Sequence, residues 1–136
     1  MNCELIFYYS TKTNLCEKAL KKSINELDLN FRSSRFTTSP ENLGECVTKI
    51  FEETNVVFII GGLTGDKNGI ENVLSKVLAT KNPDDLKKLQ NPLSSHDGYL
   101  VRQGGQLLIA LPDEPAEIEA IMSGPLKNYI VKFCEF

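Results

Sequence analysis

Glycines, a hydroxyl and an acid follow one another in the segment Gly61-Gly62-Leu63-Thr64-Gly65-Asp66, directly after an apolar run. Glycine lets the backbone approach a ligand closely, and the free N–H groups at the start of a helix favour an anion such as phosphate. Thr64 adds a hydroxyl donor. Asp66 would repel a bare phosphate, but it can bind a metal-bridged phosphate, a sugar hydroxyl or a pterin amino group. The segment, with Asn68 two positions beyond it, therefore predicts a ligand site in which Asp66 is a candidate ligand of Mg²⁺.

The same glycines also have a structural explanation, because many α/β proteins use a glycine pair only to turn the chain after a strand. The segment is neither a Walker loop, since it lacks Gly-Lys-Ser/Thr, nor a GxGxxG dinucleotide fingerprint. A second candidate segment is Leu111-Pro112-Asp113-Glu114-Pro115-Ala116-Glu117, which joins a strand end to a helix through two prolines. Pro112, Asp113, Glu114 and Pro115 are thus further candidate ligand-binding residues, with a rigid turn as the structural alternative.

Two aromatic residues and the single histidine also have both a functional and a structural explanation. Tyr8 and Tyr9 end the first apolar run, where they could stack on a planar ring, although packing in the core explains them as well. His96 lies in a polar stretch without a nucleophile nearby, so we expect it at the surface.

Apolar periodicity places both candidate segments in a series of alternating strands and helices. Residues 55–60 are apolar at nearly every position, which is typical of a central parallel strand covered on both faces. We expect the other strands over residues 4–9, 31–36, 99–103 and 106–110. We expect helices over residues 14–29, 40–51, 70–78 and 84–89, and two more near the C-terminus.

Local sequence patterns mark the ends of several elements. Asn14 and Glu17 form a candidate capping box for the first helix, while Ser39 with Pro40 predicts the start of the second. Gly104-Gly105 predicts a two-residue hairpin between the last two strands. The sequence therefore predicts an α/β fold, a three-layer sandwich around a mostly parallel sheet with a C-terminal β-hairpin.

Composition limits the class of protein. At 136 residues, with 41% hydrophobic and 24% charged residues, we expect one domain over residues 1–136. The net charge of −3 and the lack of a basic block argue against nucleic-acid binding, and no segment is long and apolar enough to span a membrane. The four cysteines have no metal-binding or redox spacing, so we interpret them as small core residues of a cytoplasmic protein. The edge left by the hairpin favours a homo-oligomer.

The two candidate segments, in this order, resemble the molybdopterin-binding domain shared by MogA-, MoaB- and MoeA-type molybdenum cofactor biosynthesis proteins and the competence-damage (CinA) family. That family has a Gly-Gly-(Leu, Thr or Val)-Gly-x-x-Asp-type loop and a Leu-Pro-Gly-x-Pro-x-Glu turn. The Gly61-Gly62-Leu63 form, the hairpin over residues 101–110 and Met122 resemble the CinA type most. The resemblance implies a small-molecule ligand, a pterin phosphate (molybdopterin) or a nucleotide, and assemblies from dimers to hexamers.

Several positions depart from the family pattern. Tyr9-Ser10-Thr11-Lys12-Thr13 replaces a Gly-Asp-Glu-Leu-Leu signature, the acid after the second strand is missing, and Asn68 stands where a second loop acid is often found. Asp113 replaces the turn glycine. Since metal-assisted phosphate chemistry needs carboxylates, the departures leave enzymatic activity open.

Three functional hypotheses remain at this stage. The first is a divergent molybdopterin-binding-like domain linked to molybdenum cofactor biosynthesis. The second is a CinA-like, metal-dependent pyrophosphatase acting on an ADP-ribose-like nucleotide. The third is a non-catalytic oligomeric or regulatory domain. The identity of the ligand, the metal requirement, the oligomer size and the pathway are not specified by the sequence.

Overall fold

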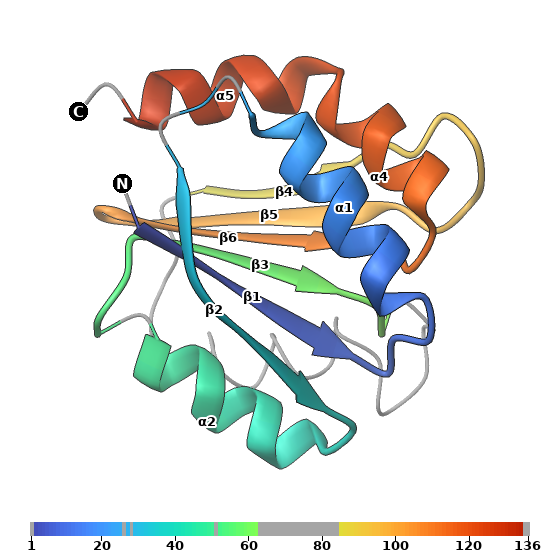
Figure 1. Ribbon diagram of the computed structural model, residues 1–136. Coiled ribbons are helices and arrows are strands. Elements are labelled where there is room, and N and C mark those ends of the chain that lie inside the picture. The colour runs from blue at the N-terminus through green and yellow to red at the C-terminus, as the bar shows by residue number, and fades with distance from the viewer. Residues whose placement is uncertain (1, 26, 28, 51, 63–84, 135–136) are drawn as a thin grey trace.

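A computed structural model describes residues 2–25, 27, 29–50, 52–62 and 85–134 (Figure 1). Within these residues, one six-stranded sheet has the order β2-β1-β3-β6-β5-β4. Four neighbouring strands are mutually parallel, namely β2 (Asn30–Thr37), β1 (Asn2–Tyr8), β3 (Val56–Ile60) and β6 (Gln106–Leu111). Strand β5 (Gly98–Gln103) is antiparallel to both β6 and β4 (Asp85–Leu89). The mostly parallel sheet is as expected.

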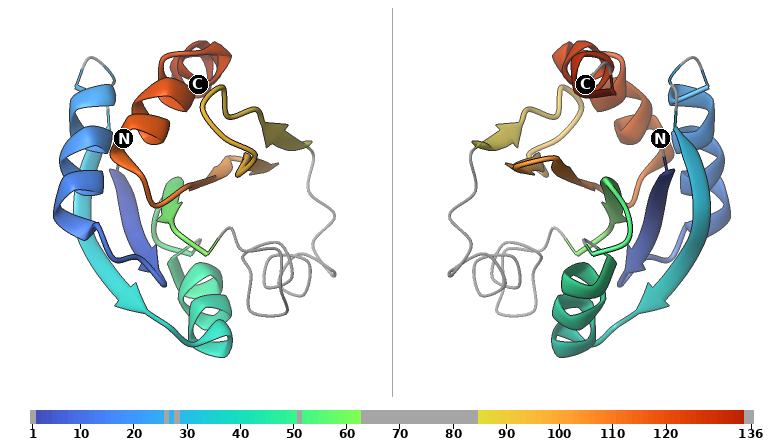
Figure 2. Two further views of the ribbon diagram at one scale, coloured as in Figure 1. Left: turned by 90° about the vertical axis from the view of Figure 1, so that its right-hand side faces the viewer. Right: turned by 90° about the vertical axis from the view of Figure 1, so that its left-hand side faces the viewer.

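Helices cover both faces of this sheet. Helices α1 (Thr13–Ser23), α4 (Pro115–Met122) and α5 (Pro125–Cys134) lie on one face, and α2 (Pro40–Ile50) lies on the other (Figures 1 and 2). The expected three-layer sandwich is therefore confirmed. No helix among the described residues combines the length and apolar character that a membrane crossing needs.

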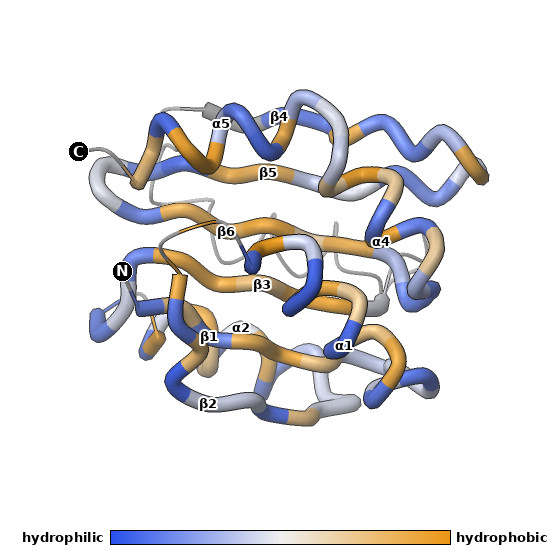
Figure 3. The backbone as a smooth tube through the Cα atoms, turned by 45° about the horizontal axis from the view of Figure 1, so that its top comes forward, coloured by the Kyte–Doolittle hydropathy of each residue, from blue (hydrophilic) through white to orange (hydrophobic). Residues whose placement is uncertain are grey.

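Strand β3 is central, and its five side chains are all fully buried. Val56, Phe58 and Ile60 contribute to the core beneath α1, α4 and α5, whereas Val57 and Ile59 contribute to the core beneath α2. Figure 3 shows this hydrophobic character along β3 and along most of its neighbour β6. A strand with helices on both faces needs apolar residues at every position, which is why it does not alternate.

The second helix begins as its sequence predicts, but the first does not. In α2 the Ser39 hydroxyl accepts a hydrogen bond from the Asn42 N–H at 3.2 Å, and Pro40 is the first helical residue. The Asn14 capping box expected for α1 is wrong, because Lys12 occupies the N-cap position without a side-chain cap. The helix also ends at Ser23, six residues earlier than expected. The loop that leads into α1 is held instead by the carboxylate of Asp113, far along the chain.

The hairpin is confirmed, but its surroundings differ from the expectation. Gly104 has a φ of 58°, and Gln103 pairs with Gln106 across the two-residue turn. Residues 84–89 were expected to form a short helix. Instead Asp85–Leu89 is strand β4, because pairing with β5 supplies ladder hydrogen bonds that a five-residue helix could not match. Among the described strands, β4 and β2 therefore form the edges of the sheet, and the hairpin does not.

Candidate functional site

The carboxyl ends of β1, β3 and β6 meet at one edge of the sheet. Phe7 pairs with Ile60, and Ile60 pairs with Leu111. The Gly61 N–H continues this ladder by donating a hydrogen bond of 2.9 Å to the Leu111 carbonyl. The glycine pair and the turn that begins at Pro112 therefore lie side by side, because they follow adjacent parallel strands. Five other candidate residues, Leu63, Thr64, Gly65, Asp66 and Asn68, lie outside the described residues.

The two glycines pack directly against Tyr8. Gly61 has a φ of 103° and Gly62 a φ of 73°, a region that residues with a Cβ rarely adopt. A Cβ at Gly61 would lie 2.2 Å from the Tyr8 carbonyl oxygen, and one at Gly62 would lie 2.3 Å from Cδ2 of the Tyr8 ring. Only glycine fits at either position. The backbone thus leaves β3 in close contact with the end of β1.

The two tyrosines at the end of β1 have different environments. The Tyr8 side chain is fully buried, so packing accounts for it, whereas Tyr9 is 43% exposed. Their ring centroids are 4.8 Å apart at an interplanar angle of 63°. Tyr9 has a φ of 52°, and its N–H donates to the Thr37 carbonyl at 3.2 Å, which fixes the chain after β1 against the end of β2. One exposed aromatic ring is therefore held against the ring of Tyr8, which itself lies against Gly62.

Asp113 joins the β6–α4 turn to the start of α1. Its carboxylate accepts hydrogen bonds from Ser10 Oγ at 2.6 Å, Thr11 N at 2.8 Å, Thr11 Oγ1 at 3.2 Å, Lys12 N at 3.4 Å and Cys16 Sγ at 3.5 Å. The two N–H groups belong to the N-cap residue Lys12 and to the residue before it, and a negative charge is favourable at a helix N-terminus. A residue about 100 positions away thus fixes the loop that leads into α1.

These contacts set the protonation of the groups involved. Burial tends to raise the pKa of Asp113, but the hydrogen bonds, above all those from Ser10 and Thr11, outweigh it and hold the pKa below its usual range. Burial, with the neighbouring Asp113 carboxylate, raises the pKa of the Cys16 thiol to about 12. Asp113 is therefore a carboxylate at neutral pH, and Cys16 is a neutral thiol that donates to it.

The neighbouring turn residues complete the junction. Glu114 forms an ion pair with Lys12, whose pKa it raises. Pro112 is buried, and Pro115 is the first residue of α4. Asp113 and Glu114 therefore both contact the β1–α1 loop. The sequence patterns did not identify Ser10 and Thr11 as partners of Asp113. The one sequence feature that points to this contact is that the β1–α1 loop and position 113 both depart from the family pattern.

A second polar network lies where β5 begins, close to the end of β6, because Tyr99 pairs with Ala110. Asn91 is 5% exposed, and its Nδ2 donates to Glu117 Oε1 at 2.6 Å, Ser94 Oγ at 3.0 Å and the His96 carbonyl at 3.1 Å. Because Glu117 belongs to the first turn of α4, these bonds tie the β4–β5 loop to the same edge of the sheet. The His96 side chain is exposed, as expected.

The described carboxylates do not gather into a metal centre. Within residues 2–62 and 85–134, apart from the gaps given above, no group of three or more His, Cys, Asp or Glu side chains is placed to hold a metal ion. Among the carboxylates considered from the sequence, Asp113 is held by the α1 terminus, and Asp66 lies outside the described part. Magnesium therefore stays a proposal that rests on Asp66.

The architecture defines the class of fold. A three-layer sandwich with the order β2-β1-β3-β6-β5-β4, with glycines after the central strand and a proline turn after its neighbour, is a molybdopterin-binding-like α/β fold of the MoaB/MogA and CinA type. The sequence by itself matches no protein-family model and no curated protein. Solved structures supply the likeness.

Three of these structures are similar over nearly the whole chain. The CinA protein of unknown function from Thermoplasma acidophilum has a TM-score of 0.75 and 18% identity, over 96% of this chain and 98% of its own. The molybdopterin biosynthesis enzyme MoaB from Thermus thermophilus has a TM-score of 0.74 and 8% identity, over 99% and 97%. The tungsten cofactor synthesizing protein MoaB from Pyrococcus furiosus has a TM-score of 0.63 and 10% identity, over 99% and 97%. At these identities the likeness establishes the fold.

Proposed function

We propose that this chain is a divergent molybdopterin-binding-like domain that binds a pterin phosphate or a nucleotide-like ligand at the carboxyl edge of its sheet. The observation that carries the proposal is the meeting of the Gly61-Gly62 backbone, the exposed Tyr9 ring and the proline turn at the ends of adjacent parallel strands. Ligands of open parallel sheets bind at this edge, because loops and helix N-termini converge there.

Each part of the proposed ligand has a counterpart in the chain. The Tyr9 ring offers a face for stacking on a planar pterin or adenine. The sequence after Gly62, with Thr64, Gly65 and Asp66, supplies a hydroxyl, a backbone without a side chain and a carboxylate for the polar groups of the ligand. The names of the similar structures, which concern molybdopterin and tungsten cofactor synthesis, support this ligand class. A role in cofactor biosynthesis would place the protein in the cytoplasm.

A second candidate function is the CinA-like, metal-dependent pyrophosphatase. It needs carboxylates free to hold a cation. Both oxygens of Asp113 already accept hydrogen bonds at the start of α1, so a metal at Asp113 would have to displace them. With Asp113 engaged in this way, Asp66 is the main acid left to hold a cation. The contact therefore favours ligand binding over metal-dependent hydrolysis.

Calorimetric titration of pterin phosphates, ADP and ADP-ribose, each with and without magnesium, tests the proposal. We expect the unmodified protein to bind one of these compounds and Asp66→Asn to bind it at least tenfold more weakly, a loss of about 1.4 kcal/mol. Asparagine caps a helix as well as aspartate does, so a mere capping role for Asp66 predicts equal binding and equal stability. The matched control is Glu52→Gln, which removes the charge of an exposed acid just before β3, at the amino ends of the parallel strands and away from the proposed site.

The outcomes separate the three hypotheses. Binding that Asp66→Asn weakens and Glu52→Gln does not supports the proposed site. Magnesium-dependent release of AMP from ADP-ribose would establish the pyrophosphatase instead. If none of the compounds binds at millimolar concentration, the ligand proposal is wrong and the non-catalytic domain is favoured.

A further inference from the structure

Strand β2 forms one edge of the sheet and carries an exposed aromatic side chain. Its inner side pairs with β1, and no other described strand pairs with its outer side. Phe36 is 64% exposed although its ring stacks on the ring of the buried Phe7, at a centroid distance of 5.0 Å. An edge strand offers N–H and C=O groups to any strand that can lie beside it. The sequence of β2 indicates which strand that is.

Six residues of β2 spell the same sequence in both directions, Phe31-Arg32-Ser33-Ser34-Arg35-Phe36. An antiparallel partner of identical sequence can therefore match Phe31 with Phe36, Arg32 with Arg35 and Ser33 with Ser34 at every position. Self-complementarity of this kind is what a two-fold symmetric interface requires, since each contact occurs twice.

A β-bulge places the two phenylalanines of this palindrome on one face of the sheet. Residues five apart point to opposite faces in a regular strand. In β2, however, the pairing with β1 shifts between Cys3 and Leu5, so that Phe31 aligns with Cys3 and Phe36 aligns with Phe7. Cys3 and Phe7 belong to the same core, so both phenylalanines lie on the α1 side of the sheet. The extra residue thus sets two aromatic groups on one face, where antiparallel self-pairing needs them.

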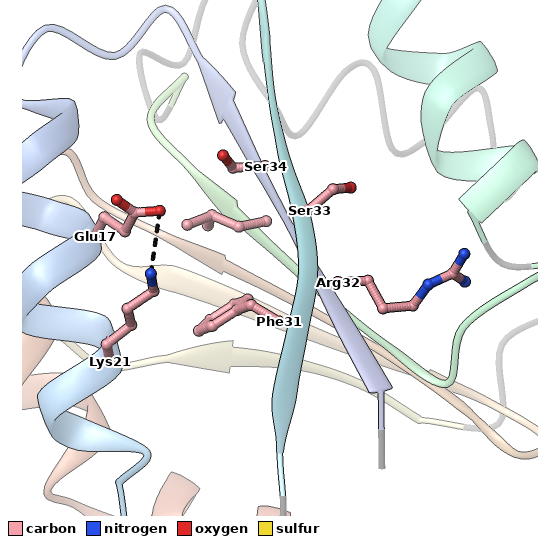
Figure 4. A pocket seen from close by; sticks show the side chains of 7 residues that line it. Glu17, Lys21, Phe31, Arg32, Ser33 and Ser34 are labelled. Carbon is pink, nitrogen blue, oxygen red and sulfur yellow. Dashed lines mark ion pairs between the residues drawn. The ribbon is translucent and has the colours of Figure 1, made fainter.

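The close view of the strand shows this arrangement (Figure 4). Phe31 and Ser34 point toward α1, while Arg32 and Ser33 point to the opposite side. A groove of about 200 Å³ lies between α1 and β2, lined by Leu5, Glu17, Lys21, Phe31, Arg32, Ser33 and Ser34. The groove leaves room beside the Phe31 ring on the face where a partner ring would lie.

We propose that two copies of this chain associate through β2, paired antiparallel about a two-fold axis between Ser33 and Ser34. The two sheets then form one continuous sheet, and the exposed Phe36 of each copy lies opposite Phe31 of the other. Aromatic residues directly opposite each other on antiparallel strands stabilise the pairing more than small residues do. The pairing also gives the outer backbone groups of both edges hydrogen-bond partners.

The charged side chains of β2 are compatible with this register. The pairing brings Arg32 of one copy opposite Arg35 of the other, on the α2 side. Each arginine carries its own acid: Arg35 lies 3.5 Å from the buried Glu4, and Arg32 lies 3.9 Å from Glu53. The carboxylates offset the repulsion between the two guanidinium groups. Ser33 and Ser34 point to opposite faces, so the ladder is interrupted at the two-fold axis, where both side chains are small.

Sedimentation velocity at tens of micromolar tests the association. We expect a dimer of the 15.2 kDa chain. We expect Phe36→Lys to raise its dissociation constant at least tenfold, because a charged lysine would replace one ring of each of the two aromatic pairs. The matched control is Leu93→Lys, since Leu93 is 59% exposed but lies in the β4–β5 loop at the other side of the sheet. Leu93→Lys should remain dimeric. A monomeric unmodified protein, a trimer, or a dimer insensitive to Phe36→Lys would overturn the proposal.

Cysteine cross-linking tests the register and does not depend on how Phe36→Lys folds. Arg32→Cys and Arg35→Cys are purified separately, and one of them carries a size tag. Because Arg32 should lie opposite Arg35 of the second copy, mild oxidation should cross-link the mixture several-fold more than either variant alone. The unmodified protein gives the background from its own four cysteines. Equal yields from the mixture and from the single variants would contradict the register.

Discussion

At the residue scale, the junction of Asp113 with the start of α1 connects two departures from the family pattern. The loop after β1 lacks the family's acids, and the turn after β6 has an acid where the family has glycine. In the structure the new acid binds the hydroxyls and N–H groups of that loop. The acid at position 113 thus binds the loop before α1, so the two departures meet in one contact.

Replacing Asp113 tests this role. We expect Asp113→Ala to lower the free energy of unfolding by about 2 kcal/mol, because hydrogen bonds to a charged acceptor contribute about 1.5–3 kcal/mol. Because folding lowers the pKa of Asp113, its contribution is full above the unfolded pKa, about 3.9, and is lost as the pH falls through the lower folded pKa. Urea unfolding at pH 7 and at pH 2.5 should therefore show the difference from the unmodified protein shrinking in acid.

A control for this measurement is Glu45→Gln, which changes an exposed acid on α2. Its effect should stay within about 0.5 kcal/mol at both pH values, as for most surface substitutions. An Asp113→Ala protein as stable as the unmodified one at pH 7 would show that the junction contributes nothing to stability.

The cysteines offer a second measurement at this scale. Burial raises the pKa of both Cys3 and Cys16 to about 12, and both side chains are fully buried, whereas Cys46 and Cys134 are only partly buried. Because the thiolate is the reactive form, a pKa of about 12 leaves roughly one thiol in 10⁴ ionised at pH 8. We expect a disulfide reagent at pH 8 to label two cysteines of the folded protein and all four in denaturant. Rapid labelling of Cys16 in the folded state would contradict the neutral thiol.

At the element scale, the parts of the fold that follow from nearby residues were predictable. Strand β3 follows from an apolar run, α2 from Ser39 and Pro40, and the β5–β6 turn from Gly104-Gly105. Strand β4 and the start of α1 were not, because β4 depends on pairing with β5 and α1 on Asp113. Of the candidate site, the meeting of the glycine pair with the proline turn followed from parallel strand order, but the contacts of Asp113 are long-range and leave no local pattern.

The glycine pair provides a prediction for the connection after β3. Gly61→Ala should lower the free energy of unfolding by at least about 2 kcal/mol, because it combines a φ of 103° with a Cβ placed 2.2 Å from the Tyr8 carbonyl oxygen. Gly105→Ala is the matched control, since a Cβ there meets nothing within 4 Å and its φ is not positive. Chemical denaturation of both variants decides the point, and equal stabilities would mean that the chain after Ile60 relaxes without cost.

At the scale of the whole molecule, the sheet has a protected centre and two unlike edges. Strands β1, β3 and β6 are paired on both sides and almost entirely buried. The edge strand β4 contains Lys87 and Lys88, and charged side chains on an edge strand discourage pairing with a further strand. The other edge, β2, carries the self-complementary sequence. Strand β4 is thus suited to face solvent, and strand β2 is suited to face a second copy. The proposed ligand site lies at the carboxyl ends of the parallel strands and is separate from both outer strands.

Hydrogen exchange at two protein concentrations examines this organisation in one experiment. Amides of β1, β3 and β6 should exchange slowest at any concentration, because they open only with the global unfolding of the core. Amides of β2 that face outward should exchange fast in dilute protein and several-fold more slowly at tens of micromolar, since association would bury them between two strands. Amides of β4 serve as the internal control and should not respond to concentration. A concentration effect on β4 with none on β2 would place the interface at β4 instead of β2. Exchange of the β3 amides as fast as that of the outward-facing β2 amides would contradict a core centred on β3.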